Sequence, residues 1–144
     1  MKVEAMLAAK QDRVITSRPQ TPISTIVRML KLEGIGAIVV SEDGEHIQGI
    51  LSERDIVRAL VDHGGRVLEM RAADLMTHGV RTCTPEDNIK DVMAAMTGSR
   101  IRHLPVVRGG KICGVISIGD VVKNRLGELE METSVLRDYA IGRG

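Results

Sequence analysis

The segment that decides the fold occurs twice in this chain, as IQGILSERDIVR at residues 47–58 and as ICGVISIGDVVK at residues 112–123. Both copies contain the pattern Gly-x-x-Ser-x-x-Asp, and apolar residues flank it at matching positions. The match continues upstream, where IGAIVV at residues 35–40 corresponds to IRHLPV at residues 101–106. Internal repetition of this kind indicates that one supersecondary unit has been duplicated. We therefore expect two similar units along the chain.

Each copy carries the same order of structural signals, namely a short strand, a helix, a pair of strands and a second helix. In the first copy these signals predict a strand at residues 13–16, a helix from Ile23 that Gly34 ends, strands at 35–40 and 46–51 around an Asp43-Gly44 turn, and a helix from Ser52 to about Val61. In the second copy they predict a strand at residues 80–82, a helix at 88–97, strands at 101–107 and 111–116, and a helix from Ser117.

A β-α-β-β-α unit exposes a sheet face that one copy cannot cover alone. We therefore predict an α/β (α+β) fold in which two pseudo-symmetric repeats pack sheet to sheet and leave two equivalent clefts between them. The expected divisions are residues 1–65 for the first repeat, 66–127 for the second repeat with a structured linker at 66–76, and 128–144 for a C-terminal helical extension.

Composition argues against several classes of function. The net charge of +1 and the single aromatic residue, Tyr139, disfavour a nucleic-acid partner, which usually requires basic excess or stacking platforms. No apolar run approaches the ~20 residues that span a bilayer, and the N-terminal segment does not resemble a signal peptide, so we expect a cytoplasmic protein without a membrane partner. Cys83 and Cys113 are expected to be buried free thiols.

The chain shows neither metal-ligand spacing among its four histidines and two cysteines nor a Walker or Gly-x-Gly-x-x-Gly loop. A convincing pair of nucleophile and base is also missing from the sequence. We therefore expect no catalytic residues, no metal site and no required cofactor.

The Ser-x-x-Asp pairs, Ser52 with Asp55 and Ser117 with Asp120, allow two interpretations. Serine at the N-cap with an acid three residues later is close to a capping box, which any helix can use. A helix N-terminus also offers free N–H groups to a phosphate, and an aspartate one turn in can accept hydrogen bonds from a ribose diol. Because the pair recurs at matching repeat positions, each time after a Gly-containing strand, we favour a nucleotide site.

From about Val3 to Asn124 the chain resembles the tandem CBS-domain pair, or Bateman module. The resemblance rests on ADLMT at residues 73–77, TPED at 84–87, RIRHLPV at 100–106 and the two Gly-x-x-Ser-x-x-Asp segments. In that family the clefts between the copies bind adenosine-containing ligands, namely AMP, ADP, ATP, NAD or S-adenosylmethionine. The resemblance implies ribose contacts at Asp55 and Asp120 with hydroxyl contacts at Ser52 and Ser117. It further implies contacts at Thr16 and Thr82, which end the first strands, and places the base against Gly36, Ala37 and Ile38 in one cleft and against His103, Leu104 and Pro105 in the other.

The two copies differ in charge. Arg102 and His103 correspond to uncharged residues of the first copy, so cations that pair with a phosphate come from one side. A β-strand would place Arg100 and Arg102 on one face toward a phosphate, and a solvated strand edge is the less favoured alternative. Arg54 lies in the first turn of a helix, where the dipole disfavours a cation unless a phosphate pairs with it. We expect the two clefts to differ in affinity or in ligand.

The final helix continues past the repeat with apolar or small residues that alternate by four and three, namely Val122, Leu126, Leu129, Thr133, Leu136 and Ala140. This stripe either covers the surface of the module itself or forms a homodimer contact, and its length favours the dimer. The favoured function is a regulatory module that senses an adenine nucleotide (AMP, ATP or NAD) and signals to an unknown protein target. The alternative is a structural or interaction protein that acts through its dimer surface and has vestigial clefts.

Overall fold

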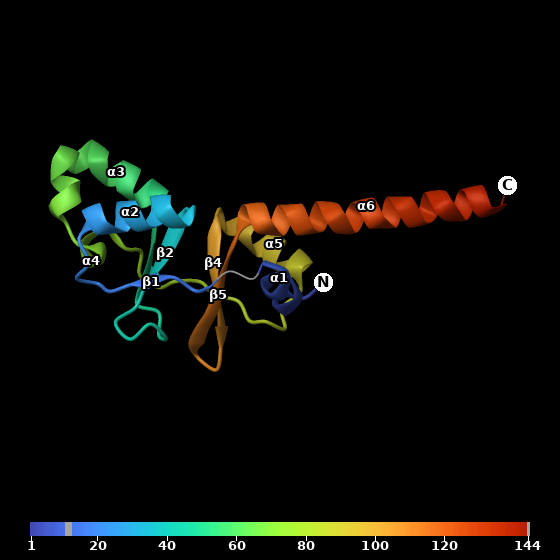
Figure 1. Ribbon diagram of the computed structural model, residues 1–144, viewed down its shortest axis with the longest axis horizontal. Coiled ribbons are helices and arrows are strands. Elements are labelled where there is room, and N and C mark those ends of the chain that lie inside the picture. Colours follow the sequence, from blue (N-terminus) through green and yellow to red (C-terminus); the bar gives the residue numbers. More distant parts are fainter. Residues whose placement is uncertain (11–12, 144) are drawn as a thin grey trace.

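The computed structural model describes the backbone of residues 1–10 and 13–143 and the side chains of residues 1–10 and 13–141. Figure 1 shows two small sheets at the centre of the molecule, helices on the outer side of each sheet, and one long helix that extends away from the body. The predicted mixed fold of two repeats with an extended C-terminal helix is therefore confirmed.

The first repeat consists of β1 (Thr16–Ser17), α2 (Ile23–Glu33), β2 (Ala37–Val40), β3 (Gly49–Ser52) and α3 (Glu53–His63). Its sheet has the order β1-β2-β3, with β1 parallel and β3 antiparallel to β2. Apolar residues at helical spacing on α2 pack against the sheet with the inward residues of β2 and β3, including Ile38, Val40 and Leu51. This repeat therefore has a core of its own.

The second repeat consists of α5 (Ile89–Ser99), β4 (His103–Arg108), β5 (Lys111–Ser117) and α6 (Ile118–Arg143). Strands β4 and β5 form an antiparallel pair in which His103 lies opposite Ser117, just as Ala37 lies opposite Ser52 in the first repeat. The duplication seen in the sequence is thus reproduced in the register of the strands. After α3 come η1 (Gly64–Glu69) and α4 (Ala72–Leu75), and Val67 and Ala72 of this segment are buried in the core of the first repeat.

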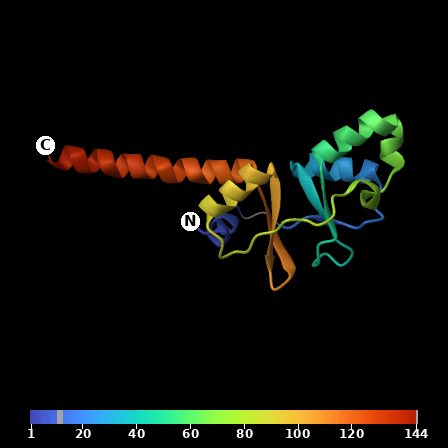
Figure 2. The same cartoon turned by 180° about the vertical axis from the view of Figure 1, so that it is seen from behind.

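Helix α1 (Val3–Lys10) was not predicted, and it packs on the second repeat although it precedes the first in sequence. Val3 and Met6 are fully buried there, in one cluster with Ile89 and Met96 of α5. The view from behind in Figure 2 also places α1 beside α5 and the base of α6. The signal was present, because Val3, Met6 and Leu7 have the i, i+3, i+4 spacing of an apolar helix face.

Both first strands are shorter than predicted. The expected strand at 13–16 is reduced to Thr16–Ser17, and the expected strand at 80–82 is absent, with a single bridge between Cys83 and Val106 in its place. Cys83 N–H donates to the carbonyl of Pro105 at 3.0 Å and its carbonyl accepts from Val107 at 2.8 Å. Pro105 has no N–H with which to extend this parallel ladder toward the preceding residues, so it stops there.

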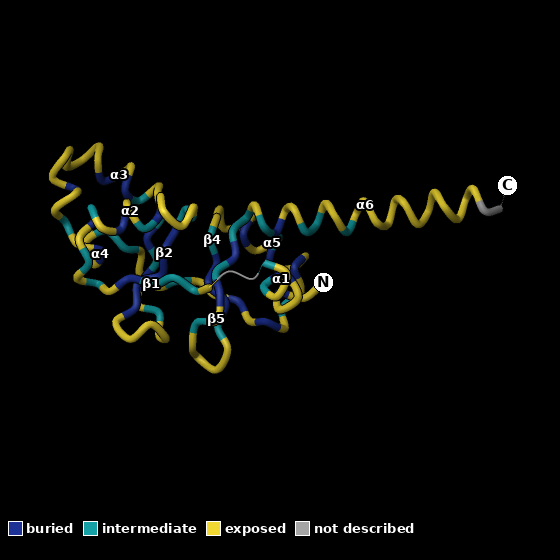
Figure 3. The backbone as a smooth tube through the Cα atoms, viewed as in Figure 1, coloured by how far each residue is buried: buried dark blue, intermediate teal, exposed yellow. Residues whose placement is uncertain are grey.

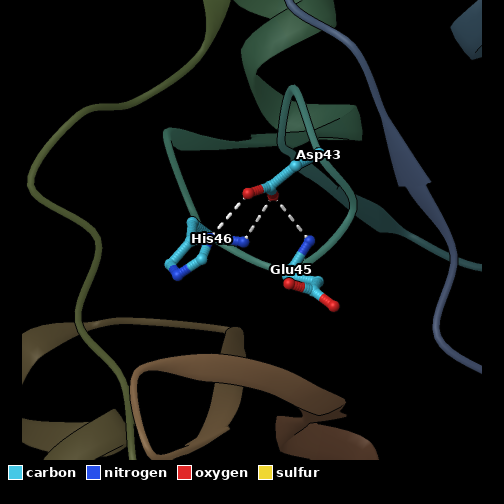
Figure 4. A group of neighbouring side chains, drawn as sticks. All are labelled: Asp43, Glu45 and His46. Atoms are coloured by element: carbon cyan, nitrogen blue, oxygen red, sulfur yellow. Dashed lines mark hydrogen bonds and ion pairs between the residues drawn. The ribbon is translucent and has the colours of Figure 1, made fainter.

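The segment between β2 and β3 is a longer loop than the expected Asp43-Gly44 turn. Figure 4 shows how Asp43 organises it: one carboxylate oxygen accepts from the N–H groups of Glu45 and His46, both at 2.8 Å, and the other lies 2.6 Å from Nδ1 of His46. These hydrogen bonds, first those from His46, hold the pKa of Asp43 well below its ordinary value. Asp43, Glu45 and His46 form an exposed cluster, and the carboxylate of Asp43 already accepts hydrogen bonds from its own loop.

The two cysteines differ in environment. Cys83 is buried as expected, and burial raises its pKa to about 12. Cys113 is exposed, so its expected burial was wrong. It lies on β5 between the half-buried Ile112 and the buried Gly114, on the strand face that points away from the core.

Among the described residues, no helix has both the length and the apolar composition that crossing a membrane requires.

Candidate functional site

Two cavities lie between the repeats, and each contains one Ser-x-x-Asp pair. The Asp55 cleft has a volume of about 490 Å³ and is lined by Gly36, Ile50, Ser52, Glu53, Arg54, Asp55, Val57, Thr77, Arg100, Ile101, Arg102 and His103. The Asp120 cleft has a volume of about 360 Å³ and is lined by Leu7, Lys10, Arg13, Val14, Ile15, Glu33, Gly34, Ile35, Ala37, His103, Cys113, Gly114, Val115, Ser117 and Asp120. Each cleft is therefore lined by residues from both repeats.

The Ser52–Asp55 pair forms a reciprocal capping box at the start of α3. The backbone N–H of Ser52 donates to Oδ2 of Asp55 at 2.9 Å, and the N–H of Asp55 donates to the hydroxyl of Ser52 at 3.3 Å. The capping interpretation is therefore correct as a description of the local geometry. It is compatible with a ligand, because every hydrogen bond found on Asp55 among the described residues ends on Oδ2 and leaves Oδ1 available.

The Ser117–Asp120 pair repeats this geometry and adds a cation. The N–H of Ser117 donates to Oδ2 of Asp120 at 3.1 Å, the reverse bond from the Asp120 N–H is also 3.1 Å, and Nζ of Lys10 lies 2.8 Å from the same oxygen. Partial burial raises the pKa of Asp120, but the hydrogen bonds from Lys10 and Ser117 outweigh burial, so the pKa lies below its ordinary value. Asp120 is thus ionised and paired with a lysine that comes from α1.

His103 lines both clefts and lies at the contact between the repeats. A Cβ at Gly36 would lie 3.0 Å from Nε2 of His103, so a larger residue there would require the imidazole to shift by a few tenths of an ångström. Burial, together with the nearby Lys10 and Arg102, lowers the pKa of His103 against the opposing effect of Glu53 and Asp120. The imidazole is therefore neutral at pH 7.

Three arginines distinguish the Asp55 cleft. Arg54 comes from the first turn of α3, Arg100 ends α5 in a left-handed conformation with φ of 55°, and Arg102 directly precedes β4. The expectation that Arg100 and Arg102 share one face of a strand was wrong, since neither lies in a strand. They nevertheless reach the same cleft as Arg54, and none of the three takes part in an ion pair within the described part of the chain.

The cations of the Asp120 cleft are balanced by acids. Nζ of Lys10 pairs with Asp120 at 2.8 Å, and Arg13 pairs with Glu33 at 2.9 Å. An anionic ligand would therefore meet unpaired guanidinium groups in the Asp55 cleft and neutralised cations in the Asp120 cleft.

Five residues that the resemblance assigned to ligand contacts do not line either cleft. Thr16 lies by the loop at Gly44, Ile38 is buried in the first core, Pro105 is buried within β4, and Thr82 and Leu104 line a separate groove of about 310 Å³ beside α5. The remaining ten, namely Gly36, Ala37, Ser52, Arg54, Asp55, Arg100, Arg102, His103, Ser117 and Asp120, line one or both clefts.

Sequence reasoning missed Lys10 and Glu53 as cleft residues. Lys10 follows Val3 by seven positions and therefore continues the inward face of α1, but a lysine at the end of a helix is usually a solvated cation. Glu53 lies within the repeated segment, but the repeat does not mark it because the second copy has Ile118 at that position.

Comparisons with known proteins show which family and fold this chain resembles. The model of the CBS domain family matches residues 9–62 and 72–127. The mitochondrial CBS domain-containing protein CBSX3 of Arabidopsis thaliana is 35% identical over 120 residues, which cover 81% of this chain and 58% of that protein. The chain therefore spans less than two thirds of this relative's length.

Solved structures give the same result. The CBS-domain containing protein ATU1752 from Agrobacterium tumefaciens superposes with a TM-score of 0.82 at 38% identity, over 87% of this chain and 99% of that one. The CBS domain pair of protein MJ0100, in complex with 5′-methylthioadenosine and S-adenosyl-L-methionine, has a TM-score of 0.78 at 22% identity, over 89% of this chain and 98% of that one. At that identity the second comparison establishes the fold alone.

Proposed function

Because the chain belongs to the CBS domain family, we propose that it is a non-catalytic regulatory module that binds an adenosine-containing ligand between its repeats and signals by a conformational change. A ligand that touches both repeats shifts their relative arrangement only as far as it binds one arrangement more tightly than another. A protein target then responds to that shift. The cytoplasmic location expected from the sequence stays a prediction.

The observation that carries this proposal is the set of unpaired cations in the Asp55 cleft. Arg54, Arg100 and Arg102 line one cavity with Asp55, whose Oδ1 is available. An aspartate suits a ribose diol, and guanidinium groups suit phosphate oxygens. We therefore assign a phosphorylated ligand of the AMP, ADP, ATP or NAD class to this cleft, with Ser52, Gly36 and His103 as further contacts.

The Asp120 cleft is proposed to accept an adenosyl ligand without a phosphate, or to bind a nucleotide more weakly. Its cations are already paired, and Ile15, Ile35 and Val115 contribute apolar surface to its lining. The complex of the MJ0100 domain pair with two adenosyl compounds that lack phosphate supports this choice of ligand class. Ala37, Ser117 and Asp120 are the proposed contacts, while Thr16, Ile38, Thr82, Leu104 and Pro105 stay predictions from the resemblance alone.

The first experiment is an ultraviolet spectrum of the purified protein, followed by thermal shifts with AMP, ADP, ATP, NAD, S-adenosylmethionine and adenosine. With Tyr139 as the single aromatic residue, bound adenine would dominate absorbance near 260 nm. A ligand at ~100 times its dissociation constant should stabilise the fold by about 2.7 kcal/mol. A flat spectrum together with no shift for any compound would favour the alternative of an interaction protein with vestigial clefts.

The matched variants are Asp55→Asn and Asp74→Asn. Both aspartates accept a backbone N–H three residues earlier at 2.9 Å, but Asp74 caps α4 outside the clefts. The loss of hydrogen bonds to a charged acceptor, worth about 1.5–3 kcal/mol, predicts that Asp55→Asn weakens nucleotide binding at least tenfold. Asp74→Asn should leave the affinity unchanged in the same calorimetric titration. Equal affinities of wild type, Asp55→Asn and Asp74→Asn would show that Asp55 caps the helix and does not bind the ligand.

A further inference from the structure

Helix α6 extends far beyond the body of the protein. It runs for 26 residues, and every side chain from residue 129 to 141 is exposed. At ~1.5 Å per residue this free part is about 20 Å long. Figure 3 shows the change from buried to exposed colouring where the helix leaves the body. A helix of this length without packing is marginally stable in water, so a partner for it is expected.

The exposed stripe of α6 has heptad spacing. Its members Val122, Leu126, Leu129, Thr133, Leu136 and Ala140 alternate by four and three along the helix. Val122, Leu129 and Leu136 then occupy the d positions of a coiled coil and the other three the a positions. The exposed fractions of Val122 and Leu129 are 42% and 41%, and that of Leu136 is 69%.

The body of the protein does not cover this stripe. Helix α6 contacts the body through a different face, which carries the buried Val121 and the half-buried Arg125 and Glu128. On a helix with 3.6 residues per turn, the stripe lies about a quarter turn to one side of that face. A partner for this stripe must therefore come from another chain, and the stripe is accessible to that chain without displacing α1 or α5.

Charges beside the stripe identify the partner as a second copy. In a parallel, in-register pair each g residue lies near the e residue five positions later on the other helix. Glu132 then meets Arg137 of the partner, and this pair occurs twice by symmetry, whereas Arg125 at the preceding g position is already paired with Glu128 of its own helix at 2.9 Å. Opposite charges at these positions set both partner choice and orientation.

The antiparallel arrangement with the same overlap is disfavoured. It places Glu130 opposite Glu130 and Glu132 opposite Glu132, and it brings Lys123 against Arg137. Like charges at such positions oppose association. We propose that α6 pairs with α6 of a second copy as a parallel, in-register, two-stranded coiled coil. This inference is independent of ligand binding in the clefts.

Sedimentation equilibrium of the full chain tests the contact. Leu129→Glu with Leu136→Glu should convert a dimer into a monomer, because two of the three d positions lose their apolar side chains. The matched control, Met131→Glu with Val135→Glu, removes two exposed apolar residues from the other side of α6 and should stay dimeric. A monomeric wild type, or a dimer that the stripe variant leaves intact, would overturn the proposal.

Charge reversal and cross-linking test the orientation. Arg137→Glu should raise the dimer dissociation constant roughly tenfold, and its combination with Glu132→Arg should restore it. In a Cys83→Ala, Cys113→Ser background, Thr133→Cys should form an intermolecular disulfide on oxidation, since the same a position faces itself in a parallel pair. Cross-linking through Glu130→Cys in its place would show the antiparallel arrangement and refute the parallel one.

Discussion

The Lys10–Asp120 ion pair distinguishes the two Ser-x-x-Asp sites, whose backbone geometry is otherwise the same. Lys10→Met should remove the ion pair on Asp120 and tighten adenosine binding in the Asp120 cleft about fivefold. This factor corresponds to ~1 kcal/mol, the upper value for a partly exposed ion pair. The measurement is calorimetric titration of adenosine in an Asp55→Asn background, in which binding to the Asp55 cleft is weakened. Weaker binding would mean that Lys10 helps to hold the ligand.

His103 should make stability depend on pH. Its folded pKa is lowered, first by burial, so the folded protein binds its proton less readily than the unfolded chain does. The stabilising contribution is present above the unfolded pKa of about 6.5 and is lost as pH falls below that value. Between pH 7 and about 5, the Tm of wild type should fall more than that of His103→Gln. Parallel curves for the two proteins would show that His103 is not the responsible group.

At the scale of elements, β3 depends on a glycine where it meets the linker. A Cβ at Gly49 would lie 2.6 Å from Sδ of Met76 and 3.0 Å from the carbonyl oxygen of Thr77, which is backbone and cannot rotate away. Gly49→Ala should therefore lower the free energy of unfolding by about 1–3 kcal/mol. Gly65→Ala is the control, since no heavy atom lies within 4 Å of its Cβ position. Equal denaturation midpoints for the two variants would contradict this account.

The sequence predicted those elements whose signals are local. Helix α2 begins after Pro22 and is ended by Gly34, which has a left-handed φ of 64°. Both residue types are recognised in a sequence as signals for helix boundaries. The strand expected at 80–82 does not form, because its partner strand contains Pro105, which has no backbone N–H to donate. This effect of Pro105 can be recognised only once the pairing of the two segments is known. The same holds for the Asp43 loop, whose length is set by side-chain hydrogen bonds to its own backbone.

The site was predictable where the repeat marks it and unpredictable where distant segments meet. Asp55 and Asp120 follow from the duplicated pattern. Arg100 was predicted as a site residue on a strand, but it reaches the Asp55 cleft from the end of a helix. Lys10 could not be found from spacing, since its contact with Asp120 joins positions 110 residues apart.

At the scale of the whole molecule, the second core depends on a residue from the start of the chain. Met6 is 1% exposed and packs with Ile89 and Met96. Met6→Ala should lower the free energy of unfolding by about 2–5 kcal/mol. Native-state hydrogen exchange should then show faster exchange in α5 and β5 than in wild type, with α2 unchanged. Faster exchange confined to the first repeat would contradict the observed packing.

The position of α1 also has a consequence for biosynthesis. Helix α1 emerges from the ribosome before both repeats, whereas the surface that buries Val3 and Met6 is completed only when α5 and α6 have emerged. Domains generally fold as units during synthesis, so the first repeat can fold early around its own core while α1 stays undocked. An apolar helix must then remain without its partner for most of translation. A nascent chain stalled before α5 should therefore present α1 to chaperones, and one stalled after α6 should not.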